Sequence, residues 1–335
     1  MSNLQQLAQS VTQWGALILL FMLVVSLLTI VVLYFIDKTQ TTQTIRRNYP
    51  VVGRFRYFFE HLGGFFRQYF FAMDREELPF NRAERSWVYK AAKDVDTTTA
   101  FGSTRSLNQE GDAMFLNSAF PTLSEDVAEP QPITVGETSC KKPYTTKSII
   151  NVSGMSYGSI SSPAIRALSN GAREAGVWMN TGEGGLSPYH LEGGCDIVYQ
   201  IGTAKYGVRN EDGTLSDDKL REISDHQQVR MFEIKMSQGA KPGKGGILPA
   251  IKVTEEISRI RGIPVGTDSI SPNGHEDIKS VSDLLDMIHR IREVTGKPVG
   301  FKMVVGQLEF FDDLFQEVHR RGIESAPDFI TIDSA

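Results

Sequence analysis

The second half of the sequence predicts an α/β fold with a parallel sheet. From residue 148 onward, short apolar β-type runs alternate with segments that carry helix start and stop signals. One helix begins at Ser162-Pro163 and ends at Gly176, and another over 280–295 carries a single apolar stripe at helical spacing. Alternating β and α elements imply parallel strands joined by right-handed crossovers.

The predicted strands share one property, which is that each ends in a polar or glycine-rich stretch. They lie at 149–152, 177–179, 231–235, a short run ending at 268–272, 299–305 and 329–332. Further helices are expected near 251–261 and 309–321. In a (β/α)8 barrel the C-terminal strand ends converge on one mouth, where the chemistry lies. The sequence therefore predicts a (β/α)8 TIM-type barrel with these stretches at its mouth.

The most unusual of these stretches runs from Lys235 to Gly246. It brings basic side chains and an amide into a glycine-rich loop directly after a strand, which is typical of an anion or cofactor site. It is not a P-loop, because Gly239 and Gly243 are one residue too close and Gly245 replaces the Ser or Thr that binds magnesium. A solvated surface loop is the alternative, and the neighbouring strand ends favour the site.

Residues 16–36 are predicted to cross a membrane. The run is almost wholly apolar and has about the 20 residues that a bilayer requires. A cleavable signal peptide is the alternative, but no basic residue precedes the run and no small-x-small site follows it. The basic residues follow the span, so the positive-inside rule predicts a single pass with a cytoplasmic C-terminal body. They are Lys38, Arg46, Arg47, Arg54 and Arg56.

The chain is expected to divide into a tail at 1–15, the transmembrane helix at 16–36, a juxtamembrane helical and irregular segment at 37–147, and a barrel at 148–335. The juxtamembrane segment is dense in aromatic residues with arginines between them. These aromatics either lie on lipid headgroups or pack against the body, and Glu60 with its acidic neighbours downstream favours packing.

Composition excludes several classes of protein. A net charge of −5 gives no reason to expect a nucleic-acid partner. The 2 cysteines, Cys140 and Cys195, are too few and too far apart for a disulfide framework, a zinc site or an iron–sulfur site, and are expected to be buried thiols. The adjacent His275 and Glu276 do not share a face, so no metal site is predicted there.

Three stretches in this order, 153–158 (SGMSYG), 180–185 (NTGEGG) and 235–246 (KMSQGAKPGKGG), resemble the FMN-binding synthase domain of glutamate synthase. The stretches 269–272 and 301–303 extend the resemblance, which covers roughly 148–335. A membrane-anchored N-terminus before such a domain resembles the stand-alone glutamate-synthase-like proteins of bacteria. The resemblance implies an FMN-dependent oxidoreductase acting on CH–NH2 donors at a bacterial-type inner membrane. Its parent reaction aminates 2-oxoglutarate reductively, through 2-iminoglutarate.

The resemblance also implies roles for individual residues. Glu183, Lys235 and Lys241 are the catalytic candidates, with Glu183 near the point where ammonia arrives. The cofactor contacts are Ser153, Gly154, Met155, Ser156, Gly158, Asn180, Gln238 and Lys302. The substrate contacts are Lys235, Gln238, Lys241, Arg261, Ser269 and Ser271. A lysine at 302 is reasonable because a cation stabilises the anionic reduced flavin. The alternatives are a surface charge for each lysine and a helix-end charge for Arg261.

The sequence departs from the family in ways that shape the expectations. The glutaminase domain with its N-terminal cysteine is absent, since Ser2 follows Met1, so ammonia is expected to come free or from a partner. The cysteines of the family's 3Fe–4S centre are absent too. The family continues past the position of Ala335 into a phosphate-binding loop and two more strands. We therefore expect a barrel truncated after about six strands that does not hold FMN tightly alone.

Two alternatives to glutamate formation stay open. One is an FMN oxidoreductase acting on another amino or 2-oxo acid. The other is a truncated, non-catalytic relative tethered to the membrane. The sequence identifies no electron donor.

Overall fold

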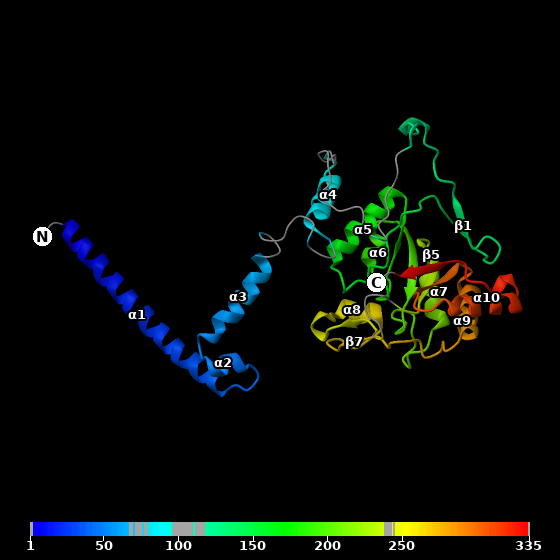
Figure 1. Cartoon of the computed structure of the whole chain (residues 1–335). Helices are drawn as coiled ribbons and strands as arrows, with labels where there is room; N and C mark the ends of the chain where they lie inside the picture. The colour runs from blue at the N-terminus through cyan, green and yellow to red at the C-terminus, as the bar shows by residue number, and fades with distance from the viewer. Residues whose placement is uncertain are drawn as a thin grey trace. The chain divides into compact units, whose positions relative to one another are not determined.

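The structure, a computed structural model, describes residues 3–66, 70, 76, 80–95, 110, 118–237, 243 and 245–333 (Figure 1). The chain forms two compact units, Met1–Pro121 and Thr122–Ala335.

The first unit is helical in its described part. Its helices are α1 (Asn3–Thr39), α2 (Thr44–Asn48), α3 (Gly53–Phe66) and α4 (Arg82–Ala92). Within α1, the segment Thr12–Thr39 contains an 18-residue window with a mean hydropathy of 3.2, and none of that window is buried in the protein. The predicted apolar helix at 16–36 is therefore confirmed. A helix of this length and composition near an N-terminus is typical of a membrane span or a signal sequence.

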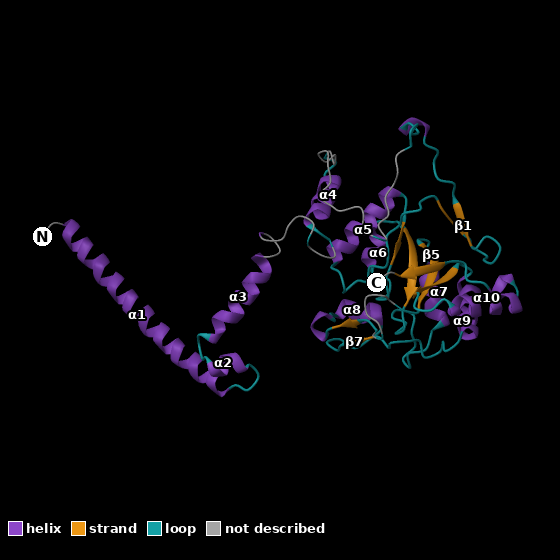
Figure 2. Ribbon diagram, viewed as in Figure 1, coloured by secondary structure: helices purple, strands orange, loops and turns teal. Residues whose placement is uncertain are grey.

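The second unit is built on a parallel five-stranded sheet with the order β3-β4-β5-β8-β9 (Figure 2). The strands are β3 (Trp178–Asn180), β4 (Asp196–Ile201), β5 (Val229–Lys235), β8 (Val299–Val304) and β9 (Ile330–Asp333). The helices are α5 (Ser162–Ala175), α6 (Pro188–Glu192), α7 (Asp217–Asp225), α8 (Glu255–Arg261), α9 (Val281–Thr295) and α10 (Glu309–Arg321). The sheet curls into a half-barrel, which confirms the predicted α/β fold of the TIM-barrel type.

Helix boundaries follow the capping residues seen in the sequence. Helix α5 has a proline in its first turn and ends at Gly176, whose φ of 68° is left-handed. The side chain of Ser280 caps α9 by accepting a hydrogen bond from the Asp283 amide. Helix α10 ends at Gly322, as predicted. Glycine suits these C-terminal positions because it adopts positive φ without a Cβ penalty.

The expected strand at 149–152 is wrong except for a single parallel bridge between Val152 and Met179. Side-chain hydrogen bonds of Ser148 and Asn151 take the place of a ladder here. The Ser148 hydroxyl donates to the Ile150 carbonyl, and the Asn151 side-chain oxygen accepts from the Trp178 amide. Side chains of this kind compete with the backbone for strand pairing.

The expected strand at 268–272 is not part of the barrel. It forms β7 (Ser269–Ile270), which pairs antiparallel with β6 (Ile247–Leu248) in a separate two-stranded sheet. Ile270 is 62% exposed, whereas strands of a parallel sheet are buried on both faces. Strand β4 and helix α7 were not predicted. Within the described residues the barrel sheet thus has five strands rather than about six.

The core lies on both faces of the sheet. On the outer face, residues such as Tyr199, Phe232 and Phe301 are fully buried against the helices, which stabilises the fold by about 2 kcal/mol for each large side chain. On the inner face, Val198 and Met231 pack with Tyr144. That tyrosine belongs to the hairpin of β1 (Ile133–Val135) and β2 (Tyr144–Thr146). The hairpin therefore covers the apolar part of the inner face.

Candidate functional site

The inner face of the sheet changes from apolar to polar toward the C-terminal strand ends. Two residues beyond Val198 and Met231, on the same face, come Gln200 and Glu233. Glu233 Oε1 accepts hydrogen bonds from Asn180 Nδ2 at 2.9 Å and from Gln200 Nε2 at 2.6 Å. Its other oxygen accepts from the hydroxyl of Thr331 at 2.6 Å. This buried polar layer joins β3, β4, β5 and β9.

A charged layer lies beyond the polar layer. Lys235 Nζ is 3.3 Å from Glu183 Oε1, and Lys302 Nζ is 3.1 Å from Asp333 Oδ1. The four side chains are between 13% and 23% exposed, so they lie at the mouth of the half-barrel. The two lysines are partners in the β5–β8 register. The strand ends therefore hold two neighbouring cations, each with a carboxylate beside it.

Glu183 is enclosed by glycine backbone. A Cβ atom at Gly246 would come within 2.5 Å of Glu183 Oε1, and one at Gly202 within 2.7 Å of its Cβ. Real Cβ atoms do not approach so closely, so a side chain at position 202 would displace the Glu183 side chain as a whole, and one at position 246 would move its carboxylate. Ser271 joins this neighbourhood, because its amide donates to the Gly246 carbonyl at 2.9 Å.

The stretch 153–158 runs across the same end of the sheet. The amide of Met155 donates to the Asn180 carbonyl at 3.2 Å, and its carbonyl lies 2.9 Å from His190 Nε2. A Cβ at Gly154 would be 3.3 Å from Asn180 Oδ1, so this backbone lies directly against the polar layer. Ser153 is exposed and Ser156 is partly buried. Gly158 has a positive φ of 96°, which favours glycine there.

His190 holds the stretch 153–158 in place. Its ring is fully buried, and Nδ1 lies 2.7 Å from the hydroxyl of Ser187 in a capping box at the start of α6. Burial lowers the pKa of His190, so its imidazole is neutral at pH 7. In this arrangement Nε2–H donates a hydrogen bond to the Met155 carbonyl, and Nδ1 accepts one from the Ser187 hydroxyl.

Arg261 connects several loops. Its guanidinium donates to Ser269 Oγ at 2.9 Å and to the Tyr157 carbonyl at 3.1 Å, and it stacks 5.1 Å from the ring centre of Tyr206. The side chain is 5% exposed, and burial lowers the pKa of the guanidinium. A Cβ at Gly184 would be 3.1 Å from its Nη2. Arg261 therefore supports the loop that carries Glu183.

His275 holds the end of β5. Its Nε2 is 3.0 Å from the Lys235 carbonyl, which orients the backbone beneath the catalytic candidate. The ring is 3% exposed, and burial is the main reason that the pKa of His275 is lowered. Among the described residues its Nδ1 has no hydrogen-bond partner.

Two of the predicted site residues, Gln238 and Lys241, lie outside the described residues. Their roles stay predictions. A groove of about 770 Å³ occurs elsewhere, between the helices α9 and α10, with Val281, Phe310 and Glu317 in its lining. Glu183, Lys235 and Lys302 do not line it, so we place the candidate site at the strand ends on chemical grounds.

A sequence model described as the conserved region in glutamate synthase matches residues 89–335. The chain belongs to the glutamate synthase family.

Curated relatives support this assignment. The glutamate synthase large subunit-like protein YerD of Bacillus subtilis (strain 168) is 37% identical over 341 residues, which cover 90% of this chain and 64% of the relative. The archaeal-type glutamate synthase [NADPH] of Thermotoga maritima is 47% identical over 151 residues, or 44% of this chain and 27% of the relative. A glutamate synthase large subunit-like protein of Rhizobium meliloti (strain 1021) is 30% identical over 227 residues, 66% of this chain and 48% of the relative. The chain spans less than two thirds of the length of each.

The buried polar layer of this glutamate synthase family member was not predicted from the sequence. Gln200 lies on the unpredicted strand β4, and Glu233 was read as part of an apolar run. A glutamate inside a buried strand is itself a signal, because a carboxylate in that position requires several donors. In the strand 229–235 (VRMFEIK), that rule identifies Glu233 as the acceptor of a buried polar network, two positions before Lys235.

Proposed function

We propose that the charged strand ends bind FMN and a 2-oxo acid in a glutamate-synthase-type oxidoreductase. The reaction is the reductive amination of 2-oxoglutarate, or of a related 2-oxo acid, through an imino acid. The observation that carries the proposal is the pairing of Lys235 with Lys302 across β5 and β8, beside Glu183 and Asp333. A dianionic substrate and an anionic cofactor both require such cations.

The residues present suit a flavin. Lys302 keeps 17% of its side chain exposed at the mouth, where an ammonium can stabilise negative charge on a reduced ring. Gly154 brings backbone close to the same end of the sheet, where a flat ring needs a surface without side chains. When bound, FMN supplies the two-electron chemistry. The remaining cofactor contacts we propose are Ser153, Met155, Ser156, Gly158, Asn180 and Gln238.

This chain's own side chains orient the substrate and deprotonate the ammonium ion. Lys235 binds a substrate carboxylate when the substrate displaces Glu183 from its ammonium. The released Glu183 carboxylate takes a proton from ammonium, so that ammonia attacks the 2-oxo carbon and water leaves. Reduction of the resulting imino acid consumes two electrons and two protons from a donor that the sequence does not identify. Lys241, Arg261, Ser269 and Ser271 complete the proposed substrate contacts.

We further propose that α1 is a single-pass anchor in a bacterial inner membrane, with the second unit in the cytoplasm. The apolar helix and the basic residues that follow it support this topology. Ammonia then arrives free in the cytoplasm or from a partner protein.

The experiment uses the protein expressed from its complete reading frame and reconstituted into lipid nanodiscs. Bound flavin is reduced anaerobically, and its reoxidation is followed by absorbance. The proposal predicts reoxidation only when 2-oxoglutarate and ammonium are both present, with glutamate as product. Reoxidation at the same rate with and without the two compounds would contradict the proposal.

A further inference from the structure

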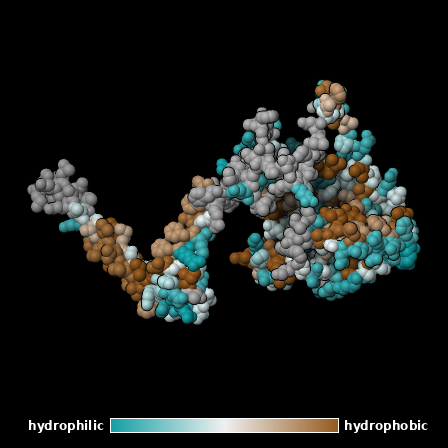
Figure 3. Space-filling model, viewed as in Figure 1, coloured by the Kyte–Doolittle hydropathy of each residue, from teal (hydrophilic) through white to brown (hydrophobic). Residues whose placement is uncertain are grey.

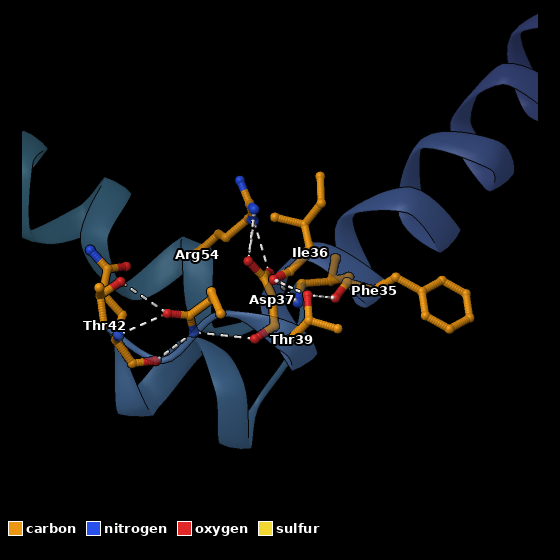
Figure 4. Close-up of polar contacts among 9 residues, drawn as sticks. Phe35, Ile36, Asp37, Thr39, Thr42 and Arg54 are labelled. Carbon is orange, nitrogen blue, oxygen red and sulfur yellow. Dashed lines mark hydrogen bonds and ion pairs between the residues drawn. The ribbon is translucent and has the colours of Figure 1, made fainter.

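The end of α1 is tied to the start of α3 by a charge pair between Arg54 and the buried Asp37 (Figure 4). Asp37, the first charged residue after the apolar run, accepts from Arg54 Nε at 2.8 Å and from Arg54 Nη2 at 2.7 Å. It also accepts from the Val51 amide at 3.0 Å. The Asp37 side chain is 1% exposed. A bidentate pair fixes orientation as well as distance, so α3 has a defined position relative to α1.

The chain between the two helices is tightly packed. A Cβ at Gly53, the first residue of α3, would be 3.0 Å from the Ile45 carbonyl oxygen and 3.2 Å from Arg46 Cα. Val51 holds a positive φ of 68°, which is unusual for a β-branched residue. Its amide hydrogen bond to Asp37 helps to maintain that conformation. The turn is thus specified by backbone contacts as well as by the charge pair.

Helix α3 is amphipathic. Phe55, Phe58, Phe59 and Leu62 follow the spacing i, i+3, i+4 and i+7 and share one face. The three phenylalanines are 59%, 58% and 61% exposed. The opposite face carries the ion pair of Arg56 and Glu60. Figure 3 shows hydrophobic surface along both α1 and α3.

We propose that this aromatic face of α3 lies in the headgroup–acyl boundary of the bilayer that α1 spans. The inference extends the proposed membrane anchor. Because Asp37 is the first residue past the apolar run, its partner Arg54 places the start of α3 at the level of the interface. An amphipathic helix with phenylalanines on one face and charges on the other binds in that plane.

The charges around the turn match anionic lipid. Lys38, Arg46 and Arg47 lie between the apolar run and α3, and Arg46 also stacks 5.0 Å from the ring centre of Tyr57. Basic residues directly beside a span are attracted to anionic headgroups. A lipid surface therefore satisfies both the aromatic face and its basic flank. The aromatic face could instead be covered by the second unit or by a second copy of the chain. The experiment below distinguishes both from lipid.

The test labels single cysteines with an environment-sensitive fluorophore on the full chain in phosphatidylcholine–phosphatidylglycerol vesicles. The variants are Phe58→Cys on the aromatic face, Glu60→Cys on the opposite face and Leu27→Cys within α1. The wild-type protein gives the background from Cys140 and Cys195. Two quenchers are compared, a nitroxide on the upper part of a lipid acyl chain and iodide in water.

The proposal predicts that lipid quenching at position 58 exceeds that at position 60 by about threefold or more, and that iodide gives the reverse order. Equal exposure to iodide at both positions would overturn it. Shielding of position 58 from both quenchers would also overturn it, since protein then covers the face. Position 27 reports on the span alone. Quenching of that label by iodide would refute the anchor, and the placement of α3 with it.

Discussion

The ammonium of Lys235, at the end of β5, lies 3.3 Å from the carboxylate of Glu183 in the loop that follows β3. Neither side chain is more than 18% exposed, so water screens the pair only in part. An ion pair in this position holds the two groups near one another until an anionic substrate competes for the lysine. This ion pair belongs to the proposed amination site.

Replacing Glu183 with glutamine tests its proposed role as the proton acceptor for ammonium. Glutamine has nearly the same shape, so it fits between Gly202 and Gly246 without unfolding the loop. We expect kcat for glutamate formation to fall about a hundredfold. Glu192→Gln, which breaks a surface pair with Arg166, is the control. Wild-type turnover in Glu183→Gln would remove Glu183 from the chemistry.

Truncating Glu233 tests the buried polar layer. Glu233→Ala leaves the donors of Asn180, Gln200 and Thr331 without an acceptor, so the free energy of unfolding is expected to fall by about 3 kcal/mol or more. Thr331→Val removes one donor and is expected to cost about 1 kcal/mol. Urea unfolding of the full chain in detergent measures both. Equal effects of the two variants would show that the carboxylate does not organise the layer.

The buried histidines predict a pH dependence of stability. Burial lowers the pKa of His190 and of His275 below the ordinary value of 6.5. Below that pH the unfolded chain binds protons that the native protein does not, so the free energy of unfolding falls as the pH drops from about 7 to 5.

Two variants isolate this contribution. His190→Asn removes one of the two groups and is expected to flatten the pH dependence, whatever it does to stability at pH 7. His289→Asn, at an exposed position of α9, should leave the dependence unchanged. Urea midpoints at pH 7 and pH 5 provide the comparison. A slope in His190→Asn that equals the wild-type slope would contradict the assignment.

The charge pair at the end of α1 gives a prediction about α3. Asp37→Asn removes the carboxylate that binds Arg54 in two places and so loosens α3 from α1. With the label at position 58, lipid quenching is expected to decrease, because the helix then samples positions away from the interface. Quenching at position 27 should not change. Arg56→Gln, which breaks an exposed pair on α3, is the matched control.

Local signals predicted much of the second unit. The boundaries of α5, α9 and α10 followed from cap residues and apolar stripes, which depend on neighbours in sequence. Strand β4 was missed because it begins at the charged Asp196 and Gln200 interrupts its apolar run. The run at 149–152 failed for the opposite reason, since its apolar residues are adjacent to Ser148 and Asn151, whose side chains take up the backbone groups.

The candidate site, too, could be predicted from the sequence only in part. The rule that polar residues gather at the C-terminal ends of parallel strands predicted that Glu183 and Lys235 share one mouth, and they lie 3.3 Å apart. The partners of Glu233 could not be predicted, because they come from positions 53, 33 and 98 residues away. Strand register decides such contacts, and the sequence does not state it. For Arg261 the sequence suggested only a substrate contact or a helix-end charge. Its guanidinium in fact supports the loops through Ser269 and Tyr157.

The most direct test of the proposed site is an FMN titration of the protein from its complete reading frame, followed by flavin fluorescence. We expect saturable binding, and Lys302→Met is expected to weaken it by about tenfold, since a charge-assisted contact is lost. Lys141→Met changes an exposed lysine beside Gly296 and should bind FMN as the wild type does. Absence of FMN binding, or equal affinity in Lys302→Met and the wild type, would contradict a flavin site at these strand ends.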